Sequence, residues 1–275
     1  MIERRDPLLL RLFYALGGAV AWFAYRVLRL RREVIRGNRE RSFPEWPKER
    51  LMAVEREFAR RQGELVAELL YSPWLDEGEM RRRLAFVDAE AIREATPERP
   101  VIVVTAHVGN FEWGIQRVAL EAGKGVIGLY KPMRNQRVDR WFRQRRSRFG
   151  GRLVPAKDVM QEVARGDVAV ICIVADQAPT TSPRRHWTRF LGQDTAFYMG
   201  PERLARVMRA RVVVAGIRRL RRGCYEAVFE PVKERGERLQ AGEMTERYAR
   251  ALERWVRDDP PGWWWSHKRW KLTRT

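Results

Sequence analysis

Cysteine and histidine are scarce in this 275-residue sequence, which holds two cysteines and three histidines. Cys172 and Cys224 lie far apart in the chain, so we expect reduced packing residues in a domain that faces the cytoplasm rather than a disulfide. The histidines are too scattered to complete a zinc-type spacing with them. We therefore expect no metal site, and no motif suggests a cofactor.

Two groups of catalytic motif are also missing. Neither serine nor cysteine stands in a Gly-x-Ser-x-Gly nucleophile elbow, which argues against a covalent acyl-enzyme site of that kind. A Walker loop and a Rossmann glycine fingerprint are absent as well. If the chain transfers a group, the sequence favours direct transfer with the acceptor's own hydroxyl as the nucleophile.

Acidic residues are outnumbered, because 35 Asp and Glu face 55 Lys and Arg, for a net charge of +20. Such an excess predicts a polyanionic partner, which can be nucleic acid, anionic lipid or an acidic protein. Arginine dominates among the cations, and its planar fork suits phosphate and carboxylate better than lysine does.

The first organised segment is a hydrophobic run from Leu8 to Leu30, unbroken between Leu12 and Tyr25. A membrane span needs about 20 apolar residues, so this run is short unless its flanking arginines snorkel. Arginines at 26, 29, 31, 32 and 36 follow, which places the rest of the chain on the cytoplasmic side. We predict a membrane anchor with a basic flank in residues 1–36, spanning the bilayer or lying in its interface. The alternative is the buried first helix of a soluble protein.

Tryptophan is abundant, with eleven residues clustered towards the two ends of the chain. This distribution suits a membrane interface better than a core. For residues 263–265 we weigh core packing and an interfacial role equally.

Beyond the anchor, strands and helices alternate. This order predicts an α/β fold, a layered and largely parallel central sheet flanked by helices, in a catalytic domain over residues 37–275. The predicted strands cover residues 101–104, 125–130, 168–175, 212–217 and 225–230. The predicted helices cover residues 49–71, 112–122, 138–149, 157–165, 200–208 and 243–257. Residues 38–46 read as a linker, residues 86–95 as a segment of mixed character and residues 188–194 as a loop.

The strand over residues 101–104 delivers His107 to its carboxyl end, where α/β folds place their sites. Asn110 is a candidate N-cap, and Glu112 would then lie in the first helical turn, where the helix dipole favours a carboxylate. A neutral imidazole can remove a proton from a hydroxyl while a carboxylate fixes its tautomer. On these residues alone, catalysis and a structural role are equally supported.

Two further predicted strands end in polar clusters, Lys131 with Arg134 and Asp176 with Gln177. The carboxyl ends of parallel strands lie along one edge of a sheet, so the three clusters can converge. Cations there can hold phosphates or balance a developing oxyanion. Asp176 can alternatively cap the following turn. We expect His186 and His267 on the surface, and the basic helix over residues 138–149 to bind an anionic ligand or to form a solvated face.

Residues 107–112 resemble the His-x4-Asp/Glu motif of the bacterial lipid A biosynthesis acyltransferase family, the late acyltransferases related to the glycerophospholipid acyltransferases. Other blocks follow in the family's order. Residues 130–135 are similar to its Tyr-Arg-Pro-x-x-Asn block, residues 174–177 to its Asp-Gln block, residues 190–192 and 200–205 to its Phe-Phe-Gly and Gly-x-x-x-Leu-Ala segment, and residues 265–271 to its Trp-x-His-Arg-Arg-x-Lys ending. The resemblance covers nearly the whole chain. Lys131 departs from the family's arginine, which weakens a bidentate phosphate contact there.

The resemblance implies transfer of a fatty acyl chain from acyl carrier protein or acyl-CoA to a hydroxyl of a lipid acceptor, a phosphorylated glycolipid such as a lipid A precursor. It implies His107 as general base with Glu112 as its partner. It assigns substrate binding to Lys131, Arg134, Arg145, Arg148, Asp176 and Gln177. It also implies a bacterial inner-membrane protein with its catalytic domain on the cytoplasmic side and an anionic membrane, not nucleic acid, as neighbour.

Two other functions remain open at this point. A nucleic-acid-binding protein would account for the charge and the arginine-rich helix, but the aromatic residues do not alternate with basic ones and the hydrophobic run would have no use. A non-catalytic relative would bind lipids without acyl transfer. The acyl length, the acceptor and the donor are not specified by the sequence.

Overall fold

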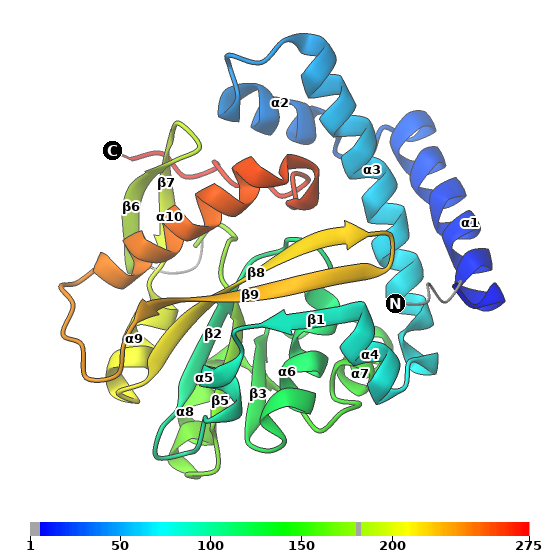
Figure 1. The fold of residues 1–275 in the computed structure, drawn as a ribbon. Coiled ribbons are helices and arrows are strands. Elements are labelled where there is room, and N and C mark those ends of the chain that lie inside the picture. The colour runs from blue at the N-terminus through cyan, green and yellow to red at the C-terminus, as the bar shows by residue number, and fades with distance from the viewer. Residues whose placement is uncertain (1–5, 180–182, 275) are drawn as a thin grey trace.

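The computed structural model describes residues 6–179 and 183–274, and a seven-stranded sheet in the order β1-β9-β8-β2-β5-β3-β4 forms its centre (Figure 1). The parallel strands are β2 (Val101–Thr105), β3 (Val126–Tyr130), β4 (Arg152–Pro155), β5 (Val170–Val174) and β8 (Arg211–Arg221). At one edge, β9 (Cys224–Lys233) pairs antiparallel with β8, and β1 (Leu84–Val87) pairs parallel with β9. The predicted, largely parallel sheet is confirmed.

Each face of the sheet has its own hydrophobic core because successive side chains of a strand point to opposite faces. Ile102 and Val104 belong to one core and Val101 and Val103 to the other. The first core includes residues of α9 (Gly200–Val207) and α10 (Glu243–Asp258), and α8 (Val159–Ala164) packs against it. The second core includes residues of α4 (Glu77–Arg83), α5 (Glu90–Arg93) and α6 (Gly114–Ala122). In Figure 1, α10 lies over β8 and β9, with α5 and α6 on the other side of the sheet.

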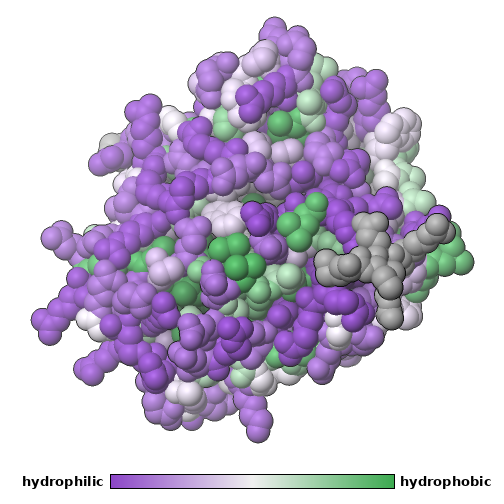
Figure 2. All heavy atoms as spheres, viewed as in Figure 1, coloured by the Kyte–Doolittle hydropathy of each residue, from purple (hydrophilic) through white to green (hydrophobic). Residues whose placement is uncertain are grey.

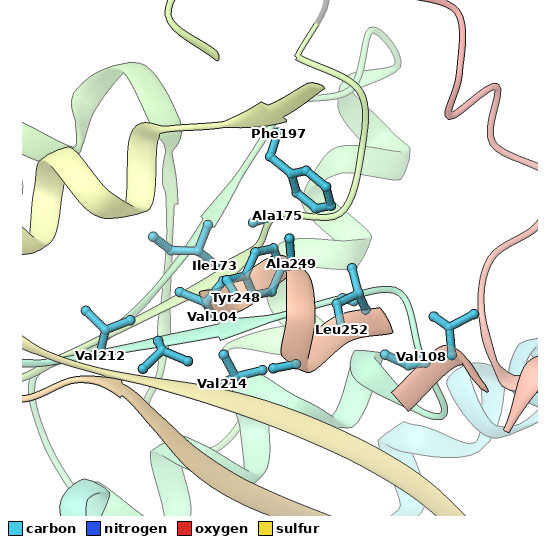
Figure 3. Close-up of a cluster of buried hydrophobic side chains, with 14 of the residues drawn as sticks. Val104, Val108, Ile173, Ala175, Phe197, Val212, Val214, Tyr248, Ala249 and Leu252 are labelled. Carbon is cyan, nitrogen blue, oxygen red and sulfur yellow. The ribbon is translucent and has the colours of Figure 1, made fainter. Parts of the chain in front are cut away.

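The α10 core is densely filled. Figure 3 shows Tyr248, Ala249 and Leu252 of α10 among Val104 and Val214 of the sheet. The hydroxyl of Tyr248 donates a hydrogen bond of 3.1 Å to the carbonyl oxygen of Thr105 at the end of β2. This contact ties α10 to the strand end that precedes His107.

At the N-terminus, α1 (Leu8–Trp22) continues as a π-helical turn (Phe23–Val27) and packs antiparallel along α3 (Lys48–Tyr71). The two helices cross in backbone contact, since a Cβ atom built on Gly17 would overlap the carbonyl oxygen of Gly63. The predicted amphipathic helix over residues 49–71 is confirmed as α3. The basic helix is confirmed as α7 (Gln136–Arg146).

Three segments differ from the sequence-based expectation. Residues 38–46 are not a linker, because most of them continue α2 (Arg32–Ser42). The boundary expected between residues 36 and 37 therefore falls inside this helix. Residues 188–194 are not a loop, because they belong to a hairpin of β6 (Arg185–Phe190) and β7 (Gln193–Tyr198). Residues 86–95 contain the end of β1 and all of α5.

Physical reasons for these differences lie in side-chain contacts and in turn geometry. The buried Asn38 amide donates hydrogen bonds of 2.9 and 2.8 Å to the carbonyl oxygens of Trp265 and His267, far along the chain. In the hairpin, Leu191 and Gly192 both have positive φ angles, 49° and 75°, as a two-residue turn between twisted strands requires.

Two tryptophans near the C-terminus pack in the core, so the interfacial role that the sequence left open is wrong for them. Trp263 and Trp265 are 2% and 0% exposed. Their indole N–H groups donate to Asp176 and to the carbonyl oxygen of Pro260. Buried indoles need such acceptors.

The contact between α1 and α3 gives a stability prediction. Gly17→Ala should lower the free energy of unfolding by about 1–3 kcal/mol, because the added methyl group overlaps the backbone of α3. Gly18→Ala is the matched control, since a Cβ atom there meets no heavy atom of the described residues within 4 Å. It should be neutral or stabilising by about 0.5–1 kcal/mol. Chemical unfolding of both variants measures the difference, and equal effects would contradict the close crossing.

Candidate active site

The register of two neighbouring strands brings His107 and Asp176 together. Thr105 of β2 pairs with Val174 of β5, and each of the two residues lies two positions beyond this pair. Because β5 lies between β2 and β3, the polar ends of all three strands meet at one edge of the sheet. The predicted position of His107 at the carboxyl end of a buried strand is confirmed.

Asp176 fixes the imidazole of His107 through its Nδ1 atom. Its Oδ1 atom lies 2.6 Å from Nδ1 of His107. Its Oδ2 atom accepts from the backbone N–H of His107 at 3.2 Å and from the indole N–H of Trp263 at 2.9 Å. The carboxylate is 3% exposed, so the three donors replace water around it. Asp176 therefore does more than cap a turn.

This pairing shifts both pKa values in the direction that favours the ion pair. Burial raises the pKa of Asp176, but the charge of protonated His107 and the hydrogen bonds from His107 and Trp263 outweigh burial and bring the pKa to about 2. Burial lowers the pKa of His107, but the charge and hydrogen bond of Asp176, with a smaller effect of Glu112, raise it above the ordinary value.

The second ring nitrogen of His107, Nε2, can accept a proton. When Nδ1–H donates to Asp176, Nε2 carries the lone pair, and the amide of Gln177 lies 3.4 Å from it. The rings of Phe111 and Trp264 flank the imidazole edge-on, with centroids 4.7 and 5.6 Å away. The arrangement holds one tautomer and one ring orientation, which a general base requires.

Glu112 has a different partner from the one implied by the motif. Both of its carboxylate oxygens accept hydrogen bonds from Arg146 of α7, each at 2.8 Å. The carboxylate in contact with His107 is that of Asp176, 69 residues further along the chain. Spacing alone could not reveal this exchange, because Asp176 and Arg146 reach the site only through the sheet and the packing of α7.

The turn between His107 and Glu112 is fixed by the hydrogen bonds of Asn110. Asn110 accepts the backbone N–H of Trp113 at 3.1 Å and so caps the 3₁₀-helix Phe111–Trp113, which confirms the predicted N-cap. Its amide donates to Glu68 of α3 at 2.7 Å. Gly109 has a φ of 53°, and a Cβ atom there would contact the backbone of Ile217. The turn therefore needs glycine at this position.

Glu68 is a residue that the sequence analysis missed. It is fully buried and also accepts hydrogen bonds from Tyr14 of α1 at 2.9 Å and from Tyr225 of β9 at 2.8 Å. Burial raises its pKa to about 7, against the opposing effect of these hydrogen bonds and that of Asn110. Glu68 thereby connects the N-terminal helix with the turn that carries the site. An acidic residue in an amphipathic helix gives no sequence signal for such a role.

A cavity of about 440 Å³ opens beside His107. It extends between α6 and the sheet, where Ile115 and Val118 face Val103 and Cys172. Ile115 packs directly against the backbone of β3 in this wall, since a side chain on Gly128 would overlap it. Polar side chains also line the cavity: His107, Glu112, Lys131, Arg146 and Gln177. The rest of the wall is largely apolar.

The other predicted binding residues lie apart from this cavity. Arg134 is exposed. Arg145 lies over the ring of Trp141 with 5.2 Å to its centroid, and Arg148 donates to the carbonyl oxygen of Ser72 at 2.7 Å. The structure thus brings Asp176 and Gln177 to His107 and Lys131 into the wall of the same cavity, but it does not place these three arginines in the described wall.

The two remaining histidines are partly buried, contrary to the surface position expected from the sequence. Nε2 of His267 accepts the backbone N–H of Ala178 at 3.2 Å, so the C-terminal segment supports the turn after Asp176. Burial lowers the pKa of His267 to about 4, and it is therefore neutral at physiological pH. His186 is paired through Nε2 with Glu246 at 2.8 Å.

Comparison with known proteins identifies the family of the chain. No curated protein sequence matches the chain. The sequence model of the bacterial lipid A biosynthesis acyltransferases matches residues 9–272, which is nearly the whole chain and includes every residue of the site. By this match the chain belongs to the bacterial lipid A biosynthesis acyltransferase family.

Proposed function

We propose that the protein is a membrane-associated O-acyltransferase that moves a fatty acyl chain from an acyl thioester to a hydroxyl of a lipid A precursor. The observation that carries this proposal is the placement of the His107 imidazole. Its Nδ1 atom is held by buried Asp176, and the same ring lines a largely apolar cavity. The thioester donor is acyl carrier protein or acyl-CoA. The family match supports the acyltransferase class over the nucleic-acid-binding alternative.

His107 acts as the general base in this mechanism. Its Nε2 takes the proton of the acceptor hydroxyl, and the oxygen attacks the thioester carbonyl to form a tetrahedral intermediate. The C–S bond then breaks, and the imidazolium returns the proton to the departing thiolate. Asp176 stabilises the imidazolium between these steps, in the way that a buried carboxylate serves a catalytic histidine. The products are the ester and the free thiol.

The cavity suits the acyl chain. Its apolar wall would exclude water from the hydrocarbon, while its cationic residues Lys131 and Arg146 are placed to meet an oxyanion or a phosphate. Glu112 acts through Arg146, which it holds with two parallel hydrogen bonds. The remaining positive surface would attract an acidic carrier protein and the anionic inner leaflet, which supports a catalytic domain on the cytoplasmic side of the inner membrane.

The first test is removal of the base and of Glu112. His107→Ala and Glu112→Ala should each remove most transfer of an acyl group from acyl carrier protein to a lipid A precursor, by about 10²–10⁴-fold for the base. Product mass, increased by one acyl group, is the readout. Circular dichroism and vesicle flotation should be unchanged. Near-normal turnover in His107→Ala would refute the mechanism, and unchanged lipid binding with no transfer in the wild-type protein would favour a non-catalytic relative.

The pH dependence tests the role of Asp176. Catalysis needs neutral His107, so kcat/KM should rise with pH through the pKa of His107, which Asp176 holds above its ordinary value. Asp176→Asn removes this charge and leaves burial as the dominant effect, so the acid limb should move to lower pH while the maximal rate falls. Glu112→Gln should move the limb less, because Glu112 contributes less to the shift. An acid limb unmoved by Asp176→Asn would disprove the assignment.

Chain-length preference tests the cavity. Cys172 lines it four residues before Asp176, about 13 Å along the strand. Cys172→Phe should fill the inner part and shift kcat/KM towards shorter acyl thioesters. The matched control is Cys224→Phe, at the other cysteine, which lies outside the cavity wall. Competition between thioesters of different length gives the ratio, and equal preferences in the two variants would rule out an acyl chain in this cavity.

A further inference from the structure

The apolar N-terminal helix is attached to the α/β domain at both of its ends. Just before α1, Asp6 pairs with buried Arg83 of α4 at 3.1 Å. At the far end, Tyr25 donates to Glu55 of α3, and Arg32 pairs with the same carboxylate at 3.3 Å. Leu8–Val27 lie between these contacts, a length of about 30 Å. That is also the thickness of the hydrocarbon core of a bilayer.

The middle of α1 is attached as well. Tyr14 donates to buried Glu68, and Gly17 meets the backbone of Gly63. The seam between α1 and α3 therefore continues along the whole apolar helix. If α1 crossed a bilayer in this arrangement, α3 would cross it too.

The surface of α3 does not allow such a crossing. Arg60 lies near the middle of α3 with a side chain that is 49% exposed, and Arg56 is exposed one turn earlier. Placing an ionised side chain at the centre of a bilayer is costly, and such residues are rare in spanning helices. A crossing would instead require α1 to leave α3, which would strip Glu68 of one of its hydrogen bonds.

The face of α1 opposite α3 is apolar and exposed. Its members, which we name the outer stripe, recur every three or four residues: Leu8, Leu12, Leu16, Val20, Phe23 and Val27. At about 100° per residue they lie across the helix from the buried Leu10, Tyr14 and Gly17. Figure 2 shows hydrophobic residues at the edge of the molecule where α1 lies in Figure 1.

We propose that α1 lies in the plane of the membrane and does not cross it, with the outer stripe inserted into an anionic leaflet. Exposed Arg11, Arg26, Arg29 and Arg31 accompany the stripe, and their charge complements anionic lipid headgroups. Apolar surface with a basic flank suits a lipid surface, because the acyl chains can receive the outer stripe while the headgroup phosphates pair with the arginines. The proposal deepens the membrane association of the proposed function and rests on it.

Depth measurement tests the orientation. Spin labels are placed at Leu8→Cys, Leu16→Cys and Val27→Cys in the full chain with Cys172→Ala and Cys224→Ala, and bound to phosphatidylglycerol–phosphatidylethanolamine vesicles. Power saturation should give all three sites a similar shallow depth, about 5–10 Å below the headgroups. A label at Val207→Cys, exposed on α9, should remain in water. Position 16 near the bilayer centre, with positions 8 and 27 at opposite surfaces, would overturn the proposal.

Flotation of variants tests the outer stripe itself. Leu12→Glu with Leu16→Glu should lower the vesicle-bound fraction at least about tenfold, while Val207→Glu, a matched exposed apolar position, should not. Equal binding of all three proteins, or no binding of the wild-type chain to anionic vesicles, would refute the in-plane helix. Transfer to detergent-dispersed acceptor should persist in these variants, so loss of membrane binding is distinguishable from failure of the proposed chemistry at His107.

Discussion

The hydrogen-bonded pair of His107 and Asp176 is the interaction on which the rest of the structure depends. It needs the observed register of β2 with β5, in which Thr105 pairs with Val174. Each of the two site residues lies two positions beyond this pair. It also needs Trp263, whose indole completes the set of donors around a carboxylate that has lost its water. The C-terminal segment is therefore part of the site, and its tryptophans are buried for this reason as well as for packing.

The two faces of the sheet have different tasks. The face under α10 is filled, and it fixes the end of β2 through Tyr248. The face under α6 is partly hollow, because a cavity of about 440 Å³ lies between α6 and the strands. His107 lies at the edge between these faces. This position lets a packed core hold the imidazole while the cavity beside it stays open.

Much of this was predictable from the sequence. The β-branched run at residues 101–104, the alternation of helices and strands, the N-cap at Asn110 and the polar residues at three strand ends all follow from local patterns, since each depends on neighbours within a few positions. These patterns indicated the sheet and the edge at which the site lies. The hairpin of β6 and β7 was missed because its turn depends on positive φ at Leu191, a residue that rarely adopts it.

The sequence by itself determined the fold class, the position of His107 at a strand end, the length and apolar character of the first helix and the family motif. Only the tertiary structure decided which carboxylate contacts the imidazole of His107, that Glu112 is held by Arg146, that Glu68 supports the turn after His107 and that α1 is joined to α3 along its length. The reason is physical. Local patterns report neighbours along the chain, whereas burial makes each of these charged groups depend on partners brought from distant elements.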